Sequence, residues 1–105
     1  MKTIIDINKN KAYAMANAVA RMSGKEKIKR EEIIENNGVF FIDININKTT
    51  VEKLPKTLQK NIFDTKEKED IIVELSNDNL NPKEKGKLIK VKLNEKREQI
   101  RNSIS

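Results

Sequence analysis

The segment VFFIDININ, residues 39–47, decides the fold of this chain. Two sets of residues alternate along it, with Phe40, Ile42, Ile44 and Ile46 on one face and Phe41, Asp43, Asn45 and Asn47 on the other. Successive side chains of a strand point to opposite faces of a sheet, so the pattern predicts a strand whose even-numbered face belongs to a core. A second short strand is predicted over residues 3–7. The match between IDIN at residues 5–8 and at residues 42–45 leaves a duplicated strand-helix unit open.

Residues 11–22 change to helical spacing. Met15, Val19 and Met22 recur three or four residues apart, and alanines flank them, which predicts an amphipathic helix with a closely packed face. The opposite face carries Tyr13, Asn17 and Arg21.

Ser23 and Gly24 interrupt that helix. Ser23 and Glu26 have the spacing of a capping box, which predicts a second helix ending near Gly38. A DNA-reading helix-turn-helix would need an apolar residue where Arg30 stands. We therefore expect a simple pair of helices joined at Ser23 and Gly24.

A third helix is predicted to begin at Thr49 or Thr50, with Pro55 near the start of its regular part. Its apolar stripe consists of Val51, Leu54, Leu58 and Ile62, and its basic stripe consists of Lys53, Lys56 and Lys60.

The C-terminal part contains two further apolar segments. Residues 70–76 and 88–93 are predicted to form two strands, and the short polar connection between them favours an antiparallel hairpin. Asn94 is then expected to cap a final short helix that runs through Ile104.

The predicted order is therefore β-α-α-β-α-β-β-α, in a single α+β domain that covers residues 1–105. The residues expected in its core are Phe40, Ile42, Ile44, Leu58, Ile62, Ile89 and Val91.

The positive charge of the chain is concentrated near its C-terminus. The whole chain has 22 Lys and Arg against 16 Asp and Glu, a net charge of +6. Residues 83–101 alone contain eight cations and three anions, so this stretch holds almost all of the excess. Such a patch attracts polyanions.

Nucleic acid is the polyanion that these residues favour, through contacts to phosphates without recognition of sequence. The residues predicted to contact phosphates are Lys83, Lys85, Lys87, Lys90, Lys92, Lys53, Lys56, Lys60, Arg97 and Arg101. Tyr13, Asn17 and Arg21 form a candidate secondary contact surface, since Asn and Arg can bond to base edges.

The composition gives little support to catalysis. The chain has no His and no Cys, which removes the commonest general base and thiolate chemistry. Neither Asp6 nor Asp43 is followed by a Glu-x-Lys triplet of the restriction-nuclease type, and both are expected on the solvent side of strands. The three glycines form no phosphate-binding loop. We therefore expect no enzyme activity, no catalytic residue, no metal and no cofactor.

Binding to a protein is the alternative function. Small, charged domains without cysteine are typical of phage-borne inhibitors of host defence or nucleic-acid-processing complexes, anti-CRISPR proteins among them. The abundance of Ile, Asn and Lys is typical of AT-rich genomes such as those of bacterial phages and mobile elements. The positive net charge argues against DNA mimicry. No apolar run approaches the length of a membrane span, so a cytoplasmic location is expected, while the oligomeric state stays open.

Overall fold

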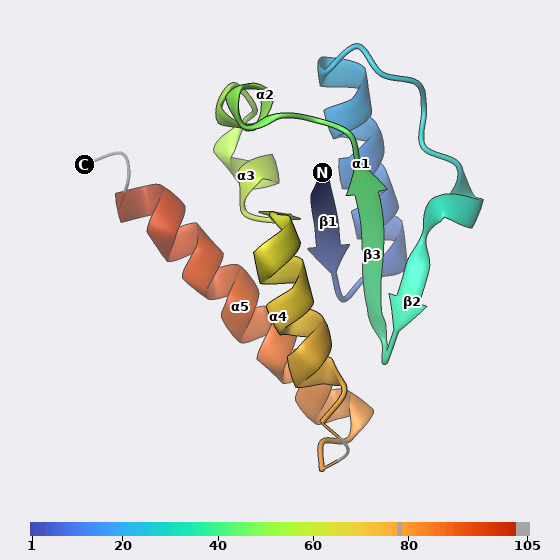
Figure 1. The fold of residues 1–105 in the computed structure, drawn as a ribbon, viewed down its shortest axis with the longest axis vertical. Helices are drawn as coiled ribbons and strands as arrows, with labels where there is room; N and C mark the ends of the chain where they lie inside the picture. The colour runs from blue at the N-terminus through green and yellow to red at the C-terminus, as the bar shows by residue number, and fades with distance from the viewer. Residues whose placement is uncertain (78, 103–105) are drawn as a thin grey trace.

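The computed structural model describes residues 1–77 and 79–102 of the chain (Figure 1). Its elements, in order, are β1 (Lys2–Asp6), α1 (Lys9–Met22), the 3₁₀ helix η1 (Arg30–Glu32), β2 (Ile34–Asn36), β3 (Val39–Ile44), α2 (Lys48–Glu52), α3 (Lys56–Gln59), β4 (Ile62–Phe63), α4 (Thr65–Leu75) and α5 (Pro82–Asn102). The described strands form one antiparallel sheet in the order β2-β3-β1-β4. The predicted α+β class is confirmed.

Helices cover both faces of the sheet. Figure 1 shows α1 behind it, and α4 and α5 as an antiparallel pair on the other side. The core on the α1 side includes Ile4, Ala12, Met15, Ala16, Val19, Ile42, Ile44 and Ile62. The core on the α4 and α5 side consists of Ile5, Val39, Phe41, Phe63, Ile71, Leu75 and Ile89. The fold is therefore a three-layer arrangement with a central sheet.

The strand predicted from residues 39–47 is β3, and its register against β1 pairs Ile42 with Ile4. Ile42 and Ile44 are buried as expected, whereas Phe40 is only partly buried. Phe41 was placed on the polar face by its alternation with Asp43, but it lies in the second core. A sheet that is covered on both faces buries residues of both parities, so one-sided alternation describes only part of this strand.

The helix predicted over residues 11–22 is α1, which begins earlier, at Lys9. Asn8 caps it by accepting a hydrogen bond from the backbone N–H of Lys11 at 3.0 Å. Met15 and Val19 are buried as expected, but Met22 is exposed at the end of the helix. The predicted face of the helix is therefore confirmed over its first three turns.

The second predicted helix is wrong. After Gly24, which has a positive φ of 70°, the chain runs through η1 into the hairpin of β2 and β3. Asn37 and Gly38 form its turn with φ of 54° and 81°. Two adjacent residues of positive φ match a type I′ turn, and Asn-Gly is its preferred pair. The Asn-Gly pair was a stronger local signal than the capping-box spacing.

The third predicted helix is divided into two short helices. α2 ends at Glu52, and α3 begins at Lys56, directly after Pro55. Ile62, which was assigned to the end of the helical stripe, lies in β4 and pairs with Ile4 of β1. Leu58 is only partly buried.

The predicted C-terminal hairpin is wrong, because both of its segments are helical. Ile71 and Leu75, four residues apart, bury one face of α4, and Ile89 buries the facing side of α5. Val91, predicted in the core, is 51% exposed. Alternation of Ile89, Val91 and Leu93 over only six residues does not distinguish a strand from one face of a helix.

The starts of these two helices are clearly marked. Asp64 and Glu67 form a capping box on α4, with the Glu67 backbone N–H donating to Asp64 Oδ1 at 2.8 Å. Asn81 accepts from the backbone N–H of Glu84 at 2.8 Å, and Pro82 occupies the first position of α5. Asn94, expected to cap a helix, lies inside α5, and the predicted end at Ile104 lies outside the described residues.

Within residues 1–77 and 79–102, none of the helices combines the length and the apolar composition needed to cross a membrane.

Candidate anion-binding face

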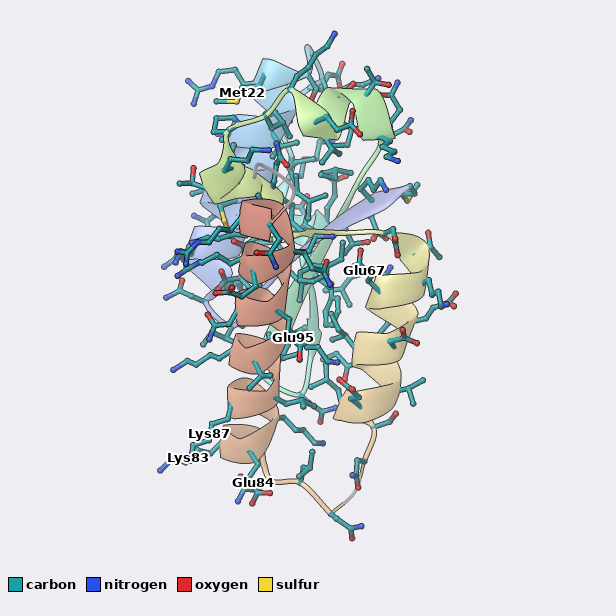
Figure 2. The ribbon with its side chains drawn as sticks, turned by 90° about the vertical axis from the view of Figure 1, so that its left-hand side faces the viewer. Met22, Glu67, Lys83, Glu84, Lys87 and Glu95 are labelled. Carbon is teal, nitrogen blue, oxygen red and sulfur yellow. The ribbon has the colours of Figure 1, made fainter. Side chains whose placement is uncertain are left out.

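Because residues 82–102 form a helix, the C-terminal cations lie on different sides of it. Lys83, Lys87, Lys90, Arg97 and Arg101, here called the basic stripe, follow one another at intervals of four, three, seven and four residues. With 3.6 residues per turn, these intervals keep all five on one side of α5. All five are exposed. In Figure 2, Lys83 and Lys87 project together, away from α4.

Three other cations of α5 lie on a different side of the helix. Lys92 Nζ is 3.2 Å from Glu74 Oε1, and Lys96 Nζ is 3.1 Å from Glu67 Oε1, so both make ion pairs with α4. Lys85 is only 8% exposed. The structure therefore separates Lys85 and Lys92 from the basic stripe, although the sequence grouped them with it.

A pocket lies beside the middle of the basic stripe. We call it the Asp6 pocket; its volume is about 180 Å³, and its polar lining consists of Asp6, Lys11, Lys60, Asn61, Lys90, Asn94 and Arg97. These residues come from the end of β1, the first turn of α1, the end of α3 and the middle of α5. Four cations from three helices therefore surround one carboxylate.

A second cavity adjoins the Asp6 pocket. We call it the Ile100 cavity; its volume is about 190 Å³, and it is lined by Lys56, Lys60, Arg97, Ile100 and Arg101. Lys60 and Arg97 line both hollows. Lys56 and Lys60, predicted from sequence, are thereby brought next to the basic stripe. Lys53 is exposed and lines neither hollow.

Asp6 and Asn61 hold each other in place in the lining of the Asp6 pocket. Asn61 Nδ2 donates to Asp6 Oδ2 at 3.0 Å and to the carbonyl of Ile5 at 2.9 Å. The other oxygen of Asp6 accepts from the backbone N–H of Asn8 at 2.9 Å. Asp6 is 4% exposed and Asn61 1%. Asn61 Oδ1 accepts no hydrogen bond from any residue that the structure describes.

The expected solvent-side position of the two aspartates is wrong for Asp6 and only partly right for Asp43. β1 is a central strand that turns directly into α1, so its last residue is enclosed by neighbouring elements. Asp43 is half-buried and accepts from Thr3 Oγ1 at 2.7 Å and from Lys68 Nζ at 3.0 Å. Both carboxylates therefore have structural partners.

The cations of the Asp6 pocket affect one another. Burial lowers the pKa of the Lys60 ammonium from its ordinary value, the charges of Arg97 and Lys11 lower it further, and Asp6 partly offsets them. Neighbouring positive charges disfavour the ionised form of one another, and a nearby anion stabilises that ionised form. The pocket is therefore electrostatically suited to a negatively charged group.

The candidate secondary surface lies elsewhere and has other partners. The Arg30 guanidinium lies over the ring of Tyr13, 4.6 Å from its centroid, and Asn17 Oδ1 accepts from the backbone N–H of Ile28 at 2.8 Å. Arg21 is exposed near the end of α1. Tyr13 and Asn17 thus hold the segment that follows α1, and none of the three lines the Asp6 pocket or the Ile100 cavity.

Sequence reasoning missed Lys11 and Asn61. Asn61 reaches Asp6 across 55 residues of chain, and no local pattern indicates that contact. The basic stripe, in contrast, had a visible signal, because intervals of three, four and seven residues are typical of one face of a helix.

Comparisons with protein-family models, with curated proteins and with solved structures found no match for this chain.

Proposed function

We propose that this protein binds nucleic acid through its phosphate backbone, using the basic stripe of α5 together with Lys11, Lys56 and Lys60. The observation that carries the proposal is the alignment of five exposed cations along one side of a single helix. From Lys83 to Arg101 the helix rises by roughly 27 Å at 1.5 Å per residue. A row of that length runs alongside about eight phosphates of one strand in a duplex.

The surroundings of the stripe favour contact with phosphates. Lys92 and Lys96 form ion pairs with Glu74 and Glu67 of α4, and Lys92 Nζ also lies 3.9 Å from Glu95 Oε2 of α5. Glu67 of α4 lies on the side of α5 that faces away from Lys83 and Lys87 (Figure 2). The basic stripe and the cations of the Asp6 pocket therefore form one continuous positive face.

The aromatic residues support binding that does not depend on sequence. Phe41 and Phe63 are buried in the core, Phe40 is partly buried, and the ring of Tyr13 is covered by Arg30. Proteins that select or hold unpaired bases stack them on exposed aromatic rings. Contacts of Lys and Arg with phosphates fix position on a strand without selecting its sequence. We propose binding without catalysis, in the cytoplasm, where such a ligand is present.

A pair of triple variants tests this proposal. The first changes Lys83, Lys87 and Lys90 to Gln; the second changes Lys25, Lys27 and Lys29, exposed in the segment after α1, to Gln. Both lose the same net charge. The proposal predicts that only the first variant binds single- and double-stranded DNA and RNA much more weakly than the parent, while both keep the helical circular dichroism of the parent.

Equal losses in the two variants would show that net charge alone attracts the nucleic acid. If the parent protein binds neither DNA nor RNA at low salt, the proposal fails. Inhibition of a host complex through protein contacts would then become the leading function.

A further inference from the structure

We infer that the Asp6 pocket binds a phosphomonoester group at the end of a nucleic-acid strand. The inference rests on the proposed function, and it goes beyond that function because it assigns a separate site for a particular phosphate. Internal phosphates lie along the basic stripe, whereas the terminal one enters the pocket.

Charge is the first argument for a monoester. Lys11, Lys60, Lys90 and Arg97 line the pocket with a single carboxylate, that of Asp6. Both oxygens of that carboxylate already accept hydrogen bonds, from Asn8 and Asn61. A phosphomonoester carries a charge of about −1.5 to −2 at neutral pH, and an internal phosphodiester carries a single charge. The local excess of cations therefore matches the monoester better.

Size is the second argument. The volume of the Asp6 pocket is about 180 Å³. It is smaller than the roughly 300–1,000 Å³ of sites that enclose whole small-molecule ligands. The pocket therefore has room for a tetrahedral phosphate group, and the remainder of the ligand has to lie outside it.

The neighbouring Ile100 cavity gives the remainder of the strand a place. It shares Lys60 and Arg97 with the Asp6 pocket and adds Lys56 and Arg101 as cations. A terminal phosphate needs only one path by which the chain leaves the pocket, whereas an internal phosphate needs two. The terminal nucleoside would lie over Ile100, with the next phosphate near Lys56 or Arg101.

The state of Lys60 also favours an anion in the pocket. Burial lowers the pKa of its ammonium, and the charges of Arg97 and Lys11 lower it further, against the effect of Asp6. A bound anion favours the charged form of Lys60.

The test compares three single-stranded oligonucleotides of one sequence, with a 5′-phosphate, a 3′-phosphate or hydroxyl groups at both ends. We expect one of the phosphorylated ends to bind roughly tenfold more tightly than the hydroxyl form, as a charge-assisted contact implies. Inorganic phosphate should remove that advantage by competition, and should shift the NMR signals of Asn61 and Lys60.

Two variants locate the effect. Arg97→Gln should abolish the preference for the phosphorylated end, and Lys83→Gln should weaken all three oligonucleotides by the same factor and keep the preference. Equal affinities of the parent for all three oligonucleotides would overturn the inference and leave the proposed function standing. Binding of inorganic phosphate without binding of any oligonucleotide would overturn the proposed function and the strand-end assignment with it.

Discussion

Asn61 and Asp6 lie 55 residues apart in the chain and are joined by a hydrogen bond of 3.0 Å between Asn61 Nδ2 and Asp6 Oδ2. The same amide group also donates to the carbonyl of Ile5. These contacts, together with the hydrogen bond from the Ile5 backbone N–H to the Asn61 carbonyl at 3.0 Å, fasten the segment between α3 and β4 to the end of β1. Lys60, the neighbour of Asn61, and Lys11 line the same pocket.

The Asn61 contact predicts a stability effect. Asn61→Ala leaves Asp6 Oδ2 and the Ile5 carbonyl without this donor in a buried place, so the free energy of unfolding should fall by about 1–3 kcal/mol. Urea denaturation measures it, and Asn36→Ala, at a partly buried position on the edge strand, is the control. A loss below about 0.5 kcal/mol is what an ordinary surface substitution causes, and it would show that the contact does not stabilise the fold.

A matched pair of substitutions on α5 tests its helical register. Ile89 is fully buried, and Val91 is half-exposed on another side of the helix. Ile89→Ala should lower the free energy of unfolding by roughly 2–5 kcal/mol, and Val91→Ala should change it by less than about 0.5 kcal/mol. In a strand both side chains would share one face, so comparable losses at the two positions would contradict the helix.

The acid stability of the protein should depend on Asp64. The hydrogen bond from the backbone N–H of Glu67 lowers the pKa of the Asp64 carboxyl below its ordinary value, with help from Lys2 and against the effect of burial. A carboxyl with a lowered folded-state pKa stabilises the fold above its unfolded pKa and loses that contribution as the pH falls through the folded value.

Asp64→Asn keeps a good capping residue and removes the titration. The variant should therefore lose less stability than the parent as the pH falls below about 4. Thermal melts between pH 2 and pH 7 measure the difference, and parallel curves for the two proteins would refute the role of Asp64.

Lys60 should cost stability in the absence of an anion. Its pKa is lowered in the folded state, chiefly by burial and then by Arg97 and Lys11, so its charge opposes folding below that pKa. The opposition disappears as the pH rises past the unfolded value. Lys60→Gln should therefore raise the melting temperature at pH 7, with a smaller gain at about pH 11.

Inorganic phosphate should reduce the gain of Lys60→Gln, because a bound anion favours the charged lysine of the parent. Lys53→Gln, which lies outside both cavities, is the control and should show no such dependence on phosphate. A lower melting temperature for Lys60→Gln at pH 7 without phosphate would be incompatible with crowded cations in the pocket.

The sequence predicts the central elements of the fold well and its C-terminal part poorly, for reasons that individual residues explain. The alternation around Ile42 and the spacing of Met15 and Val19 reflect burial, which fixes β3 and α1. Between residues 70 and 93 the apolar residues stand in two short groups, at 71–75 and 88–93, and alternation at Ile89, Val91 and Leu93 resembles a strand. Tertiary packing of Ile71 and Leu75 against Ile89 then decides in favour of helices.

The candidate site was predictable only in part. The cations of the basic stripe lie close together in the sequence, so the local excess of positive charge could be predicted. Which side of the chain each cation occupies could be known only once the segment was known to be a helix. The separation of Lys85 and Lys92 from that stripe depends on the position of α4. The Asp6 pocket is formed by residues of β1, α1, α5 and the end of α3. Amino-acid composition does not predict contacts between segments so far apart in the chain.

The salt dependence of binding tests the central proposal most directly. Each phosphate neutralised on a single strand lowers the slope of log K against log salt by about 0.7. Contact by all eight cations of the proposed face, the basic stripe with Lys11, Lys56 and Lys60, therefore predicts a slope of about −5.6. Changing Lys83, Lys87 and Lys90 to Gln should bring the slope to about −3.5, the value for the five remaining cations. A slope near zero for the parent, or the same slope in the parent and the triple variant, would contradict the assignment of this face to nucleic acid.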